Sequence, residues 1–396
     1  MKKTILTTML LFMFLSSNFV LAQVNPEIQL GARGVFSFNN DIINNSKSSA
    51  INDFSDSGFL LGFRQKMYND FRGQFVLGFQ FPDADSDLGQ IFFHQVFIKL
   101  EDKHNIIKLG RSRVKSSLIE FATLRDDDAL NLTDVLNPYS NGTNTEDNQF
   151  GNVIEFTHIF GQRYWLTLHG EHFTKSNYAT GVTTETDFSM NALGFSFEYR
   201  VPQSQLWNRD VIQQVGISFN NFLTDRQGYS NKFDKLLKNV IFSTIVNVVP
   251  DPVNFVDFRL QAIYNNGFSE ITSIADYKDI AEAKSLSVFF GPRYLLRVLE
   301  RPALQLSVYG GFKTLPDLSN NSKQFQLVAN SFYRLGENFD LGIQYQFKKN
   351  TGDLTNFLPA KEHRIQLAMI FAIDQIWNNQ FDDRESILNL EHGYIK

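Results

Sequence analysis

The chain has 396 residues, no cysteine and a formal net charge of −5 at pH 7. A net acidic chain without basic tracts is not expected to bind nucleic acid, and without disulfides it must be held together by an extensive hydrogen-bond network. It contains 40 Phe and 13 Tyr, although hydrophobic residues make up only 43% of it. That composition is expected when aromatic side chains face lipid and polar side chains face a lumen.

Residues 1–22 have the three regions of a secretory signal peptide, in order. Lys2 and Lys3 precede an apolar run, and Val20 and Ala22 are small enough to predict cleavage before Gln23. No later run approaches the roughly 18 apolar residues that a membrane helix needs. If the mature chain lies in a membrane, it must therefore cross it with strands that close into a barrel.

From residue 28 onward, apolar and polar side chains alternate in segments of about ten residues, which is the length of a tilted membrane strand. Residues 338–348 give the clearest pattern, with Phe, Leu, Ile, Tyr and Phe on one face and Asp, Gly, Gln, Gln and Lys on the other. The alternation predicts sixteen strands, at 28–39, 57–68, 72–81, 90–100, 104–112, 150–159, 162–173, 187–200, 210–222, 237–249, 253–265, 284–297, 302–313, 324–334, 338–348 and 362–376.

Short and long connections alternate between these segments, as in outer-membrane barrels with tight periplasmic turns and longer outer loops. Short turns include 101–103 and 250–252, whereas 40–56 and 113–149 are predicted to be loops. Period-two alternation also fits a soluble sheet with one buried face. The even strand number and the phase of the loop lengths favour the barrel. The predicted class is all-β, a transmembrane antiparallel up-and-down barrel over residues 23–377, in the outer membrane of a Gram-negative cell.

The longest connection, 113–149, lies between the fifth and sixth predicted strands. In this topology the chain resembles sixteen-stranded porins, whose third outer loop folds into the lumen and narrows it. The stretches TLRDDDALNLTDVLNP and DDRESILNLEHGYIK resemble porins of the Bacteroidota, distantly similar to the phosphate-selective group. The resemblance implies that 113–149 is the constriction and that the protein assembles as a homotrimer.

One departure from that family is the polar segment 378–396, because porins usually end on a strand-terminal aromatic residue. We expect this segment to form a periplasmic tail. The tail supports an alternative function, in which the barrel is an accessory subunit that docks onto other outer-membrane proteins through residues 378–396.

Charges at the narrowest ring of a pore determine which solutes pass. The alternation assigns basic side chains to the inner wall, whereas the loop is mainly acidic. The predicted pore residues are Arg33, Arg64, Arg72, Arg259 and Arg293 on the wall, and Glu120, Arg125, Asp126, Asp127 and Asp128 on the loop. Two interpretations stay open: a transverse field that orients small polar solutes, or ion pairs that only pin the loop.

No catalytic or metal site is predicted. Three consecutive aspartates lack the alternate spacing of a calcium loop, and His169 and His172 point to opposite faces of a strand. No nucleophile motif accompanies the seven histidines. The sequence therefore predicts a non-enzymatic porin without cofactor, which contacts outer-membrane lipid and admits small polar solutes or ions, with a preference for anions.

Overall fold

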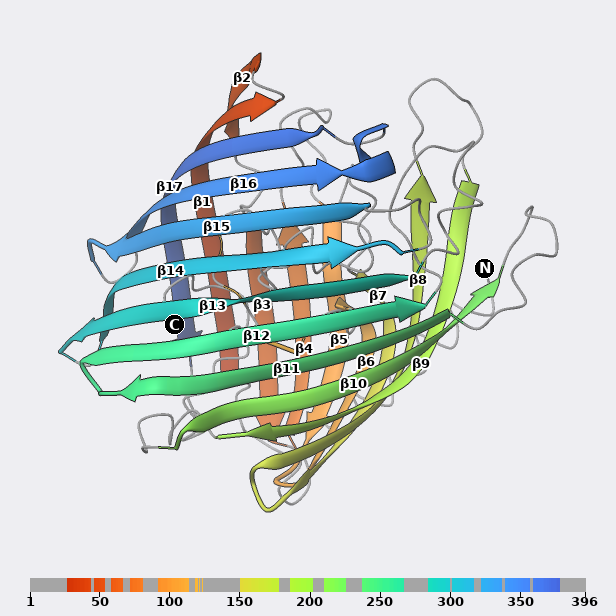
Figure 1. Ribbon diagram of the computed structural model, residues 1–396. Helices are drawn as coiled ribbons and strands as arrows, with labels where there is room; N and C mark the ends of the chain where they lie inside the picture. Colours follow the sequence, from red (N-terminus) through yellow and green to blue (C-terminus); the bar gives the residue numbers. More distant parts are fainter. Residues whose placement is uncertain are drawn as a thin grey trace.

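The computed structural model describes residues 27–43, 46–53, 58–66, 72–80, 92–113, 118–119, 121, 123, 150–177, 186–201, 210–225, 237–266, 284–299, 301–316, 322–336, 339–356 and 359–377. The predicted signal peptide and the predicted tail lie outside these residues. Seventeen strands and one short 3-10 helix make up the described part (Figure 1). No helix among the described residues is long and apolar enough to cross a membrane.

The strands follow one another in chain order and are all antiparallel to their neighbours (Figure 1). Their bounds are β1 (Glu27–Ile43), β2 (Ser46–Asp53), β3 (Gly58–Lys66), β4 (Arg72–Gln80), β5 (Phe92–Glu101), β6 (Asn105–Arg113), β7 (Phe150–Phe160), β8 (Tyr164–Asn177), β9 (Thr186–Arg200), β10 (Ile212–Asp225), β11 (Leu237–Pro250), β12 (Asn254–Asn266), β13 (Ser285–Val298), β14 (Arg301–Thr314), β15 (Lys323–Arg334), β16 (Phe339–Thr351) and β17 (Lys361–Trp377), with η3 (Gly352–Asn356) after β16.

The strand pairings form a continuous circuit. From β3 to β17, each strand pairs with the next, and β17 pairs with β1 from Ile28↔Trp377 to Ile43↔Glu362. The β1 strand completes the circuit because its first half pairs with β3. All wall strands thus satisfy their backbone groups on both edges, which is the condition for a sheet that spans lipid.

The sixteen predicted strands are all present, but the predicted loop at 40–56 is wrong in part. The β1 strand continues to Ile43, and β2 pairs with its second half, from Ser37↔Asp53 to Ile43↔Ser46. Both β2 and β3 therefore face β1, one beyond the other, and share one position in the circuit. The β2 strand has the polar sequence SKSSAIND, which lacks the alternation that marks the wall strands.

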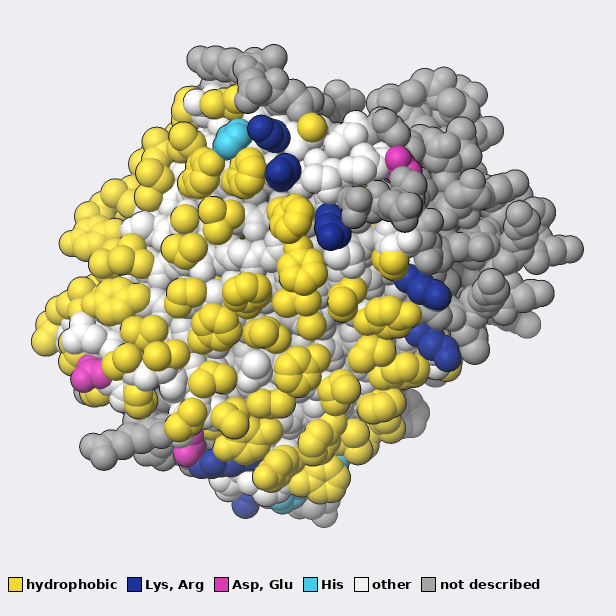
Figure 2. Space-filling view, in the orientation of Figure 1, with side chains coloured by type: hydrophobic (Ala, Val, Ile, Leu, Met, Phe, Trp, Pro, Cys, Tyr) yellow, Lys and Arg dark blue, Asp and Glu magenta, His cyan; other side chains and the backbone are white. Residues whose placement is uncertain are grey.

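The barrel is polar inside and apolar outside. On β16, inward positions such as Gln344 and Gln346 are buried, whereas the alternating Leu341, Ile343 and Tyr345 are exposed. The same alternation recurs from strand to strand, so exposed apolar side chains form a broad belt around the wall (Figure 2). A soluble sheet would bury this face, whereas a transmembrane barrel presents it to lipid.

Tight turns join the strands at one rim and longer connections join them at the other. In two of the tight turns, an aspartate side chain accepts hydrogen bonds from the backbone N–H groups two and three residues later. Asp102 accepts hydrogen bonds from the backbone N–H of His104 and Asn105, and Asp251 accepts them from Val253 and Asn254, at 2.7 Å in all four cases. Aspartate commonly closes turns in this way.

A row of inward polar side chains crosses five strands at the same register. His169 on β8 contacts Asn220 on β10 at 2.5 Å, and Asn220, Asn239 and Asn265 continue the chain of side-chain hydrogen bonds. The first contact passes over Gly194 of β9, where an added Cβ would lie against both His169 and Asn220. Because Gly194 has no side chain, His169 of β8 and Asn220 of β10 can meet above β9 on the inner face of the barrel.

Adjacent glycines on β14 offer a matched test of the inward face. A Cβ on Gly311 would clash with the Val288 carbonyl and lie 2.5 Å from Phe289 Cδ2, whereas a Cβ on Gly310 would meet its nearest atom, Leu327 Cδ1, at an ordinary 3.7 Å. We expect Gly311→Ala to destabilise the barrel by about 1–3 kcal/mol, as overpacking does, and Gly310→Ala to be neutral. Urea unfolding in detergent micelles measures both, and equal stabilities would contradict this packing.

Candidate lumen site

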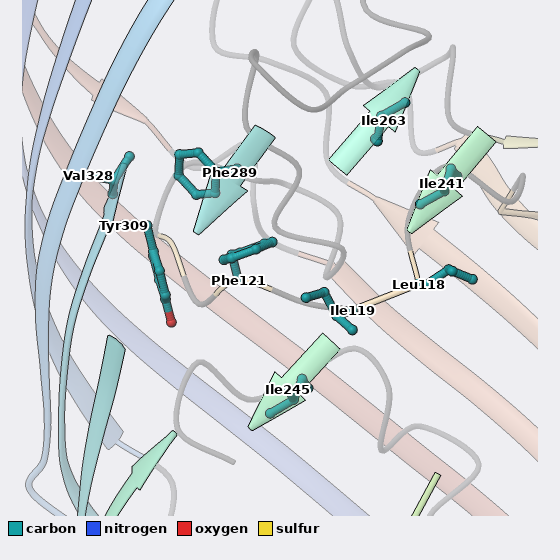
Figure 3. Close-up of a cluster of buried hydrophobic side chains, with 9 residues drawn as sticks. All are labelled: Leu118, Ile119, Phe121, Ile241, Ile245, Ile263, Phe289, Tyr309 and Val328. Atoms are coloured by element: carbon teal, nitrogen blue, oxygen red, sulfur yellow. The ribbon is translucent and has the colours of Figure 1, made fainter. Parts of the chain in front are cut away.

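Part of the long loop 113–149 lies against the inner wall. Leu118, Ile119 and Phe121 are 8%, 4% and 1% exposed, and Thr123 is also buried. The three apolar side chains pack with inward residues of five neighbouring strands: Ile241, Ile245, Ile263, Phe289, Tyr309 and Val328 (Figure 3). We call these nine residues the inner apolar cluster.

Phe121 is held by two aromatic rings of the wall. Its ring centroid lies 4.9 Å from that of Phe289 on β13 and 5.1 Å from that of Tyr309 on β14, edge to face in both cases (Figure 3). Such T-shaped pairs are worth about 0.5–1.5 kcal/mol beyond the apolar area they bury. Gly311 leaves the space that Phe289 occupies.

Side-chain amides of the wall bind the backbone of the same loop segment. The Gln261 Oε1 atom accepts hydrogen bonds from the backbone N–H of Leu118 (3.1 Å) and Ile119 (3.4 Å). Gln214 Nε2 donates to the Leu118 carbonyl at 2.8 Å and also to Glu198 Oε2 at 3.1 Å. The segment is therefore fixed to β10 and β12 through its backbone, in addition to the apolar packing of its side chains.

A buried charge cluster lies next to this contact, one inward position from Gln261 along β12. Asp257 Oδ2 accepts hydrogen bonds from Arg293 Nη2 at 2.5 Å and Nε at 3.0 Å, and Asp257 Oδ1 accepts one from Arg259 Nε at 3.3 Å. Two guanidinium groups thus share one carboxylate. The cluster carries one net positive charge on the wall beside the loop.

The structure brings only some of the predicted pore residues together. Arg259 and Arg293 meet on Asp257, whereas Arg64 on β3 forms a separate buried ion pair with Glu27 at 2.7 Å. Eight strands, β4 to β11, separate β3 from β12 along one arc of the circuit, and six separate them along the other. Arg64 therefore lies across the barrel from the Asp257 cluster, and the predicted wall residues do not form one compact site.

Of the remaining predicted pore residues, only Arg72 has a described side chain. Arg72 is half-buried on β4, directly opposite Glu101 of β5. Arg33 belongs to β1, but its side chain is not described. The loop residues Glu120, Arg125, Asp126, Asp127 and Asp128 lie outside the described residues, so the acidic face predicted for the loop stays a prediction.

Charges on the inner wall separate into two groups by burial. The buried inward positions balance, with five bases (Arg64, Arg259, Arg293, Lys313 and Lys348) and five acids (Glu27, Glu171, Glu198, Asp257 and Asp340). The half-buried inward positions do not balance, with seven bases (Arg72, Lys99, Lys108, Arg200, Arg297, Arg334 and Arg364) and three acids (Glu101, Glu155 and Glu362). Three ion pairs, Arg200–Glu198, Arg334–Asp340 and Lys348–Glu362, join the two groups, so the surplus of bases belongs to the inner wall as a whole.

The inner apolar cluster was not foreseen from the sequence, which suggested charges as the means of holding the loop. The sequence does contain a sign of this cluster, because some strands carry large apolar residues at consecutive positions and so on both faces. Ile241-Phe242 on β11 and Phe289-Phe290 on β13 each place a large apolar side chain inward beside one that faces outward. Leu118, Ile119 and Phe121 are the matching apolar group at the start of the loop.

This matching can be tested with neighbouring phenylalanines on β13. Phe289 is 0% exposed in the inner cluster, whereas Phe290 is 41% exposed on the outer belt. We expect Phe289→Ala to weaken the loop contact by about 3 kcal/mol, as for other buried Phe truncations, and so to speed trypsin cleavage after Lys115 or Arg125 in the folded protein. The outer control, Phe290→Ala, should be cleaved at the wild-type rate, and equal acceleration in both variants would contradict the contact.

Solved structures similar to this one include an outer-membrane channel and a porin. No family model matches the sequence, and no curated protein sequence matches it. The chain is similar in structure to the outer-membrane channel DcaP of Acinetobacter baumannii, at 13% identity and a TM-score of 0.59 over 89% of this chain and 99% of that one. It is also similar to an anion-selective porin from Comamonas acidovorans, at 12% identity and a TM-score of 0.61 over 88% and 100% of the two chains. OmpF of Salmonella typhi matches at 11% identity and a TM-score of 0.57 over 87% and 97%. The fold is that of a porin-like β-barrel, which together with the apolar belt supports the predicted outer-membrane location.

Proposed function

We propose that this protein is an outer-membrane porin through which small polar solutes diffuse, with loop 113–149 as its constriction. The observation that carries the proposal is the fixed loop segment inside a polar-lined barrel. Leu118, Ile119 and Phe121 are held against the wall by packing and by hydrogen bonds to Gln214 and Gln261. A loop attached to one side of the lumen narrows the remaining passage.

We also propose that the passage favours anions. The support is the surplus of bases on the inner wall, where twelve basic side chains at buried and half-buried inward positions accompany eight acidic ones. Side chains that reach into a water-filled lumen act on a passing ion, whereas the buried pairs such as Arg64–Glu27 largely neutralise themselves. The comparison protein from Comamonas acidovorans, described as an anion-selective porin, has a similar fold.

The other parts of this interpretation stay proposals. They are the signal peptide at 1–22, a periplasmic tail at 378–396, assembly as a homotrimer and the absence of enzymatic activity. The accessory-subunit function depends on the tail, which lies outside the described residues, and no described contact favours it over a channel.

Planar-bilayer recording tests both the channel and its selectivity. Under a KCl gradient, we expect the wild-type protein to conduct with a reversal potential on the anion-selective side. The double variant Arg72→Gln/Lys108→Gln removes two half-buried inward charges and should move that potential toward zero. Lys349→Gln, an outward residue of β16, should behave as the wild type. A protein that inserts without conducting would contradict the porin, and an unchanged potential in the double variant would contradict the role of the wall charges.

A further inference from the structure

Five lysines point outward at the rim where the long connections leave the barrel. All five are exposed and occupy the strand ends of one half of the circuit: Lys238 (β11), Lys284 (before β13), Lys323 (β15), Lys349 (β16) and Lys361 (β17). Figure 2 shows basic side chains in a diagonal row along one edge of the yellow apolar surface. We call these residues the lysine row.

Four of the lysines lie directly above the apolar belt on their own strands, and on β17 His363 lies between Lys361 and the first belt residue, Ile365. On β15, the next outward positions after Lys323 are Phe325 and Leu327, which are 41% and 40% exposed. On β16, Phe347 and Tyr345 follow Lys349 in the same way. One step of two residues covers only about 7 Å along a strand, so the ammonium groups lie at the border of the lipid-facing surface.

The pairing within the row brings like charges together. Lys349 and Lys361 are direct cross-strand partners on β16 and β17. Like charges in this arrangement destabilise a sheet unless something offsets their repulsion. Lys323 is flanked on both sides by hydroxyl residues, because it lies opposite Thr314 of β14 and Thr351 of β16. Both hydroxyls donate to backbone carbonyls, Thr314 to that of Leu286 and Thr351 to that of Lys323, so it is the positive charge of the lysines at this rim that suits an anion.

The opposite rim of the same strands differs. Its outward positions carry mainly apolar side chains, among them Val248, Val253, Val298 and Leu335, all between 49% and 60% exposed. The described strand ends therefore distinguish the two surfaces of the membrane by charge, and only the rim with the long connections has such a row among the described residues.

An apolar groove lies in the belt below the lysine row. Its volume is about 520 Å³, and it crosses the outer faces of β12 to β16. Small or compact residues, Pro292, Ala329 and Ser331, form part of its floor, and the rings of Tyr294 and Tyr345 line it. Tyr345 is four residues from Lys349 on β16, or about 13 Å at the rise of a strand. An acyl chain spans such a distance.

We propose that the lysine row and this groove bind a membrane lipid with an anionic phosphate headgroup in the leaflet at the long-connection rim. Its phosphate lies between the ammonium groups of Lys323, Lys349 and Lys361, and one acyl chain occupies the groove. The phosphate adds a negative charge beside the cross-strand neighbours Lys349 and Lys361, and the groove provides contacts that a free anion cannot make. This inference requires the barrel to lie in a membrane, but it does not require the lumen to conduct.

Native mass spectrometry of the full-length protein in micelles tests the inference, with dioleoyl phosphatidic acid and dioleoylglycerol as probes that differ only in the phosphate. We expect the phosphatidic acid to be retained and the diacylglycerol to be lost. Basic residues near a lipid surface contribute enough that removing three should weaken retention by about tenfold or more. The variant Lys323→Gln/Lys349→Gln/Lys361→Gln should show this loss, and the corresponding triple Arg variant should retain the lipid.

The groove is tested separately by Ala329→Phe, which fills it while leaving the lysines in place and should also reduce retention of phosphatidic acid. Equal retention of the two lipids by the wild-type protein would overturn the inference, as would full displacement of phosphatidic acid by an equal concentration of inorganic phosphate. If the Gln variant does not fold, the wild-type protein still decides the matter, because raising NaCl from about 0.05 to about 0.5 M should release the lipid by screening. Retention that does not depend on salt would contradict binding by the lysine row.

Discussion

Every backbone N–H and C=O of this wall must find a partner within the sheet, because hydrocarbon offers none. The pairing of β17 with β1 meets this demand over sixteen residue pairs, from Ile28↔Trp377 to Ile43↔Glu362. Once the circuit is closed, the alternation of each strand has only one consequence: one face meets lipid and the other meets the lumen. The apolar belt, the inward glutamines and asparagines, and the buried ion pairs all follow from that closure.

Inside the barrel, most inward side chains are polar, and several charged ones are paired. A group of apolar exceptions lies where the loop segment covers the wall. Arg64 and Glu27, or Arg293 and Asp257, neutralise each other on neighbouring strands, as buried charges must. Ile241, Phe289 and Val328 break the polar character of the inner face, and they do so where Leu118, Ile119 and Phe121 cover them. On one side of the lumen, the loop segment therefore supplies the apolar partner against which these wall residues pack.

The wall strands were predictable because lipid and lumen impose a period of two on each of them, as in β16. The β2 strand was not, since Ser46–Asp53 extends β1 with a polar sequence that shows no such period. The ion pairs also escaped prediction, because Arg64 meets Glu27 across 37 residues only through the register of β3 on β1. Arg64 and Arg293 were correctly assigned inward, but their separation around the circuit depends on the three-dimensional order of the strands and not on local pattern.

The inner apolar cluster lies on one side of the barrel, so the inner wall is asymmetric. Its wall residues come from β11 to β15, so the bulk of the attached segment occupies that half of the cross-section. The strands β4, β5 and β6 lie on the opposite side of the circuit from this segment. Arg72, Lys99 and Lys108 stand on those three strands. The passage proposed above is therefore bordered by an apolar surface on the side of β11 to β15 and by these three basic side chains on the opposite side.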